Sequence, residues 1–128
     1  MSYFFSTTLD TTLDEAVDLV TAALKEQGFG ILTEIDIQAT LKEKLDVDFR
    51  PYRILGACHP PFAYEALLKE KNIGLMLPCN VIVQEVEPGR IEVAAVDPVA
   101  SMQAVENESL GEVAIEVQRR LREVIEGL

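Results

Sequence analysis

The sequence predicts an α+β domain with a mainly antiparallel sheet of about five strands and two long helices packed on one face of it. Two segments, 12–27 and 107–128, carry apolar residues at the three- and four-residue spacing of an amphipathic helix. Short segments rich in β-branched and aromatic residues lie before and between them, which is typical of strands. The last two of these segments flank a proline–glycine turn, which predicts an antiparallel hairpin.

The first strand is expected at residues 3–8 and the first long helix directly after it. Thr12 and Glu15 have the spacing of a capping box at a helix start. Gly28 is typical of the residue that follows a last helical turn. The apolar stripe of this helix is expected to face the sheet, and consists of Leu13, Ala16, Val17, Val20, Ala23 and Leu24.

Residues 31–37 alternate, which predicts a strand with Ile31, Thr33, Ile35 and Ile37 on one face. Its other face would carry Leu32, Glu34 and Asp36. A short helix follows at residues 37–45, with Asp36 as its N-cap. Residues 50–58 form the next expected strand, in which Gly56 indicates a bulge or a close backbone approach.

Pro61 fits the first turn of another short helix, because a backbone N–H there would be unpaired in any case. In the hairpin of residues 81–96, Glu87-Pro88-Gly89-Arg90 fits a type II turn. Asp97-Pro98 ends the second hairpin strand, and Asn107 is expected to cap the final helix, with Gly111 inside it. Two helices cover one face, so the second face of the sheet must be solvated or covered by a partner.

The composition fits one domain spanning residues 1–128 and excludes several classes of partner. A net charge of -11 argues against nucleic acid, whose binding depends on lysine and arginine facing phosphates, and against anionic membranes. No apolar run is long enough for a membrane helix, and residues 1–10 lack the pattern of a signal peptide. We therefore expect a cytosolic protein.

Cys58, His59 and Cys79 are the side chains best suited to metal or thiol chemistry. A zinc site would need a fourth ligand, for which Glu34 or Asp97 could serve, but the spacing matches no recognised zinc pattern. We therefore predict no cofactor.

The two cysteines suggest two further interpretations. In the first, Cys79 or Cys58 acts as a reactive thiol with His59 as a base, as in a thiol-dependent enzyme or a redox sensor. In the second, both cysteines pack as small hydrophobic residues, and His59 is a surface or capping group. We favour the second interpretation, since the sequence shows no complete catalytic set.

Several polar residues near strand ends are candidates for binding a small molecule, if they converge on one cleft. The candidates are Glu34, Asp36, Lys42, Arg53, His59 and Asn80. The alternative is ordinary salt bridging, in which Glu34 or Asp36 pairs with Lys42 or Arg53.

Two motifs connect the chain to a known family. RPYRILGACHPP at 50–61 and IGLMLPCNVIV at 73–83 resemble the signature of the domain-of-unknown-function family numbered three hundred and two, and the resemblance covers nearly the whole chain. It implies a fold similar to that of the TATA-binding protein, with a strand, a helix, four strands and a final helix. It also implies a homodimer, and it brings no established biochemical function. We therefore expect a soluble homodimeric, non-enzymatic module that binds a small molecule or a protein, with the thiol enzyme or redox sensor as the alternative.

Overall fold

The computed structural model describes residues 2–128 and contains one five-stranded antiparallel sheet with the strand order β1-β5-β4-β3-β2. The strands are β1 (Phe4–Asp10), β2 (Gly30–Asp36), β3 (Tyr52–Cys58), β4 (Cys79–Glu87) and β5 (Arg90–Val96). The α-helices are α1 (Leu13–Glu26), α2 (Ile37–Leu45), α3 (Pro60–Lys69), α4 (Pro98–Ser101) and α5 (Gly111–Glu126). Two 3-10 turns are η1 (Ile73–Met76) and η2 (Glu108–Leu110). The predicted α+β class and five-stranded antiparallel sheet are confirmed.

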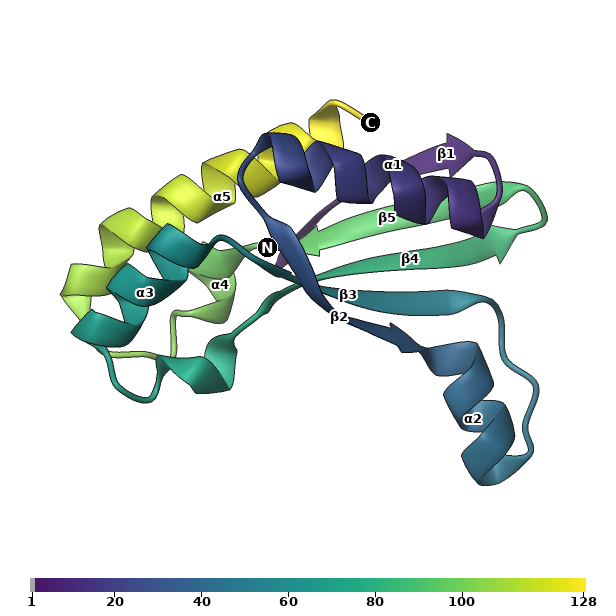
Figure 1. Ribbon diagram of the computed structural model, residues 1–128, viewed down its shortest axis with the longest axis horizontal. Coiled ribbons are helices and arrows are strands. Elements are labelled where there is room, and N and C mark those ends of the chain that lie inside the picture. The colour runs from purple at the N-terminus through teal and green to yellow at the C-terminus, as the bar shows by residue number, and fades with distance from the viewer. Residues whose placement is uncertain (1) are drawn as a thin grey trace.

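The two long helices, α1 and α5, lie beside each other over one face of the sheet, which we call the helix face (Figure 1). Alternate residues of β4 and β5 point toward them, and Val81, Val83 and Val93 are fully buried there. The apolar stripes of the helices supply the other half of this core, with Val20 and Leu24 from α1 and Val117 and Leu121 from α5. The stripe of the last helix is therefore used for core packing and is not free for a partner.

The predicted local signals at the starts of α1 and α2 and at the hairpin are confirmed. The Thr12 hydroxyl accepts a hydrogen bond from the backbone N–H of Glu15 at 3.2 Å, and the Asp36 carboxylate accepts one from Ala39 at 2.9 Å. Gly89 adopts a φ of 78°, as the third position of a type II turn requires. These contacts fix where α1 and α2 begin and join β4 to β5 by a tight turn.

The expected face of residues 31–37 is wrong for part of the segment. A bulge between Ile31 and Thr33 adds one residue to β2, so Ile31 pairs with Ala57 on the helix face while Ile35 pairs with Ile54 on the opposite face. Leu32 lies in the bulge and is 67% exposed. Ile37 is the first residue of α2 and not part of the strand.

The start of the final helix also differs from the prediction. The Asn107 side chain accepts a hydrogen bond from Ser109 and caps the short turn η2, not the long helix itself. Gly111 is then the first residue of α5 rather than an interior one, where its cost to the helix would be larger.

The second face of the sheet, which we call the open face, is not covered by α1 or α5 (Figure 1). At its β2–β3 edge the helix α2 projects away from the sheet, and none of the residues of α2 is buried. Within residues 2–128, no helix is long and apolar enough to cross a membrane.

Gly56 allows a close approach on the open face, as the sequence suggested. A Cβ atom at this position would overlap Thr33 Oγ1 and lie 2.7 Å from Pro78 Cγ. The absent side chain thus lets Pro78 and Thr33 pack directly on the backbone of β3.

We predict that Gly56→Ala destabilises the protein by about 2 kcal/mol, because the methyl group overpacks this contact. The matched control is Gly30→Ala in the neighbouring strand, where a Cβ would meet no atom within 4 Å. Urea unfolding of both variants gives the comparison. Equal stability of the two variants would contradict the close approach.

Candidate functional site

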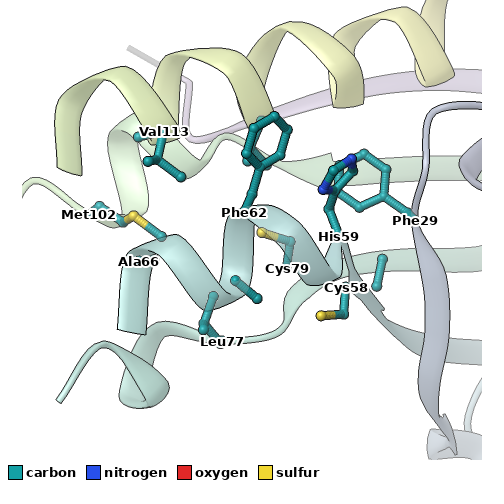
Figure 2. A pocket seen from close by; sticks show the side chains of 13 residues that line it. Phe29, Cys58, His59, Phe62, Ala66, Leu77, Cys79, Met102 and Val113 are labelled. Carbon is teal, nitrogen blue, oxygen red and sulfur yellow. The ribbon is translucent and has the colours of Figure 1, made fainter. Parts of the chain in front are cut away.

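The three residues singled out for metal or thiol chemistry border one small cavity where β3 and β4 meet α3 (Figure 2). Its volume is about 30 Å³, which accommodates one or two water molecules and no larger ligand. The wall is almost entirely apolar, and is formed by Phe29, Ala57, Cys58, His59, Phe62, Ala63, Ala66, Leu77, Cys79, Met102, Val113, Ala114 and Val117.

Cys58 and Cys79 reach this cavity from opposite faces of the sheet. Cys79 pairs with Ala57 and belongs to the buried core of the helix face. Cys58 is the next residue along β3, and its pairing with Gly30 places it on the open face. Both thiols are free, and neither sulfur points at the other in Figure 2. The two cysteines thus share a cavity wall without forming a pair.

His59 is held in place by aromatic packing. Its ring stacks on Phe62 with the ring centres 4.2 Å apart and meets Phe29 edge-on at 5.4 Å (Figure 2). Gly28 makes room for it, because a Cβ there would lie 2.7 Å from His59 Nε2. His59 caps the start of α3 by position but makes no side-chain hydrogen bond to the helix.

The surroundings of His59 favour its neutral form. Its Nδ1 atom is buried and has no hydrogen-bond partner within residues 2–128. Burial lowers the pKa of His59, and the positive charge of Arg120 lowers it further. A neutral ring with one enclosed nitrogen is suited to packing, and no group among residues 2–128 bonds to Nδ1 to orient the ring as a base.

Cys79 is a poor nucleophile for a similar reason. Burial raises the pKa of its thiol to about 11, and the neighbouring Cys58 contributes to the increase. Since the thiolate is the reactive form, Cys79 is almost entirely in the unreactive thiol form at neutral pH.

The residues considered as a fourth metal ligand have other partners. The Asp97 carboxylate accepts hydrogen bonds from the backbone of Val99 and the side chain of Gln118. Glu34 lies 3.4 Å from Arg53. Across residues 2–128, no three His, Cys, Asp or Glu side chains gather in a way that could hold a metal ion.

The candidate ligand-binding residues do not converge on one cleft. Arg53 joins Glu34 to Asp14 of α1, at 3.4 and 3.0 Å, beside the start of that helix. Lys42 lies on the projecting α2 and pairs with Asp46 at 2.9 Å. Asp36 is used as the cap of α2. These residues sit on different elements. Of the ion pairs expected as the alternative, the structure contains Glu34 with Arg53.

Two members of that set border larger hollows: Lys42 lines one of about 560 Å³ beside α2, and Asn80 lines one on the sheet itself. The hollow beside Asn80, which we call the sheet groove, lies on the open face and has a volume of about 470 Å³, within the range of roughly 300–1,000 Å³ for small-molecule sites. Ile82 and Ala94 form its apolar floor, at the centre of β4 and β5. The remaining lining residues are Tyr3, Phe4, Arg50, Tyr52, Gln84, Glu92, Ala95 and Val96.

A row of polar contacts crosses one side of the sheet groove. Arg50 donates from Nε to Gln84 Oε1 at 2.8 Å, and Gln84 donates from Nε2 to Glu92 Oε1 at 2.8 Å. The guanidinium of Arg50 also lies over the rings of Phe49 and Tyr52, at 4.5 and 5.6 Å from their centres. These contacts fix donors and acceptors from β4, β5 and the chain before β3 along one edge of an apolar floor.

Sequence reasoning missed most of the sheet groove because its residues come from separate strands and from the chain before β1 and β3. Only strand pairing places Tyr52, Gln84 and Glu92 side by side across β3, β4 and β5. A signal was present in β4, where Asn80, Ile82 and Gln84 alternate with the buried Cys79, Val81 and Val83. This alternation indicated that Asn80, Ile82 and Gln84 lie on the face of the sheet that does not pack against the core.

We predict that ionisation of Cys79 destabilises the fold at high pH. Its pKa in the folded protein, about 11, is above the ordinary thiol value of about 9, so the stability that the neutral thiol contributes is complete below about pH 9 and is lost as pH rises to about 11. A difference of about 2 pKa units corresponds to about 3 kcal/mol. Urea unfolding from pH 8 to 11 should show a steeper loss for the native chain than for Cys79→Ala. Parallel curves for the two proteins would refute this role.

Comparisons with known proteins place the chain in a family. No functionally curated protein matches it. The crystal structure of an uncharacterized conserved DUF302 protein from Bacillus stearothermophilus superimposes with a TM-score of 0.89 and 26% sequence identity, over 98% of both chains. The sequence pattern of the family described as domain of unknown function DUF302 matches residues 5–128. The chain therefore belongs to the DUF302 family.

Proposed function

We propose that this chain is a homodimeric, non-enzymatic module that binds a small molecule in the sheet groove. The observation that carries this proposal is the groove itself, which combines a volume of about 470 Å³ with an apolar floor and a fixed polar edge. Small-molecule sites usually have this composition, with a few placed polar groups around an apolar surface. The cavity beside His59, at about 30 Å³, has no comparable space.

The lining of the sheet groove indicates the kind of ligand. Ile82 and Ala94 offer a flat apolar surface, and Tyr3, Phe4 and Tyr52 add aromatic rings around it. The row of Arg50, Gln84 and Glu92 presents both donors and acceptors. A flat, partly apolar molecule with a hydrogen-bonding edge fits this arrangement.

The alternative, a thiol-dependent enzyme or redox sensor, has less support. Its nucleophile would be Cys79 or Cys58 with His59 as base, and the raised pKa of Cys79 and the lowered pKa of His59 both work against an activated thiolate. The cytosolic location that we propose is consistent with the two thiols being free, because disulfides are rare in that compartment.

We predict that Cys79 resists alkylation. In Cys58→Ser, Cys79 is the only thiol, and iodoacetamide at pH 7.5 should modify the folded protein roughly 100-fold or more slowly than the urea-unfolded protein, because the thiolate is scarce. Mass spectrometry gives both rates. Rapid labelling of the folded protein would support the thiol-dependent enzyme or redox sensor instead.

We predict that Ala94→Phe blocks ligand binding, because the added ring fills the floor of the sheet groove. Val86→Phe is the matched control, since Val86 lies on the same sheet but outside the groove. Ligand-observed NMR with a fragment set of aromatic amides and amines should give hits on the native chain and on the control, with loss of those hits on Ala94→Phe. Hits that survive Ala94→Phe, or a screen without hits, would overturn the groove as the binding site.

A further inference from the structure

The lining of the sheet groove contains one residue of each charge. Among the described residues that line it, Arg50 is the only basic one and Glu92 is the only acidic one. Within residues 2–128 neither of them takes part in an ion pair. Gln84 lies between the two and bonds to both. The groove thus keeps a positive and a negative group apart.

The guanidinium of Arg50 is held in place with most of its donors free. Of its five N–H donors, only the one on Nε bonds to another side chain within residues 2–128, that of Gln84. The guanidinium also stacks over the rings of Phe49 and Tyr52, at 4.5 and 5.6 Å from their centres. The edge formed by Nη1 and Nη2 therefore remains as a planar fork, and such a fork matches the two oxygens of a carboxylate.

The strand register places this fork beside one end of the apolar floor. Gln84 pairs with Glu92 in the polar row, and two residues along β4 Ile82 pairs with Ala94 in the floor. Asn80 follows at the far end, about 13 Å from Gln84 at the usual rise of a strand. A ligand whose acid group lies at the fork therefore has its body over the floor and its far end near Asn80.

Aromatic side chains border the floor on two sides. Tyr52 lines the groove from β3, while Tyr3 and Phe4 line it from β1 and the residue before it. The rings of Tyr3 and Phe4 meet edge to face, with their centres 5.0 Å apart. Aromatic rings prefer further rings in offset or edge-to-face contact. These borders favour a planar ring over an aliphatic chain as the body of the ligand.

We propose that the ligand of the sheet groove is an aromatic carboxylate with a single negative charge. Its carboxylate binds the Nη1–Nη2 edge of Arg50, and its ring lies over Ile82 and Ala94. The inference rests on the proposed function of the groove and names the chemical class of the ligand.

Glu92 limits the charge that the ligand can carry. Together with Arg50 it makes the lining formally neutral, so a second negative charge on the ligand would meet no basic residue of the lining. The net charge of -11 on the whole chain acts in the same direction. Like charges placed together at a binding site cost affinity. A doubly charged phosphate ester is therefore a poorer ligand than a carboxylate on the same ring.

The ring and the carboxylate contribute differently to binding. Arg50 is an exposed residue, and ion pairs of exposed groups add little free energy. Burial of the ring on the floor should supply most of the affinity, while the carboxylate supplies selectivity. An exposed ion pair at the upper end of the usual range corresponds to a preference of about 5-fold over a neutral group of the same shape.

The test uses calorimetric titration with naphthoate, naphthamide and naphthyl phosphate, all substituted at the same ring carbon. Arg50→Gln removes the fork, and Arg90→Gln is the matched control, because it removes the same charge at the start of β5, outside the groove. The native chain and Arg90→Gln should bind naphthoate about 5-fold more tightly than naphthamide. Arg50→Gln should bind the two equally, and naphthyl phosphate should bind less tightly than naphthoate to the native chain.

The outcomes separate the ligand class from the groove. If naphthoate and naphthamide bind the native chain equally and Ala94→Phe abolishes both, the groove stands as a binding site and the carboxylate class is overturned. A preference for naphthoate that survives Arg50→Gln, or tighter binding of naphthyl phosphate, also overturns this inference. If no probe binds, the groove and the ligand class both fall. Circular dichroism melts within a few degrees of the native chain confirm that each variant is folded.

Discussion

Burial of β4 and β5 beneath α1 and α5 is the contact on which the rest of the molecule depends. Val81, Val83 and Val93 have no exposed surface, and the residues that cover them come from both ends of the chain. Apolar burial of this kind is the main favourable contribution to folding. It fixes the two long helices on one side, and in doing so it leaves the other side of the same strands uncovered.

The open face is therefore a consequence of the core, and the residues and the helix at its edge give it an uneven surface. Pro78 and Thr33 pack on the backbone at Gly56, and α2 projects beyond the edge formed by β2 and β3. Over β4 and β5, Gln84 and Glu92 form a polar row with Arg50, which precedes β3, beside an apolar floor. The rigid sheet holds these groups in fixed positions, as a binding site requires.

At the cavity beside His59, residues of types that often carry catalysis serve packing instead. Cys58, His59 and Cys79 lie within one wall, yet the alternation of β3 directs Cys58 to one face and Ala57 to the other, where Ala57 pairs with the buried Cys79 of β4. The aromatic rings of Phe29 and Phe62 occupy the space around the imidazole. The helix α3 holds His59 through Phe62 on its inner side and leaves Tyr64, Leu67 and Leu68 exposed on its outer side.

The sequence by itself determined the two long helices, the caps at Thr12 and Asp36 and the hairpin turn at Gly89, because each follows from local spacing or backbone geometry. At Gly56 it left a bulge and a close approach open, and the packing of Pro78 and Thr33 decided for the close approach. Tertiary structure alone decided the bulge after Ile31, the separation of Glu34, Lys42 and Arg53 from Asn80, and the formation of the sheet groove. These features depend on which strands pair and in what register. Pairing joins residues far apart in the chain, and no local pattern records it.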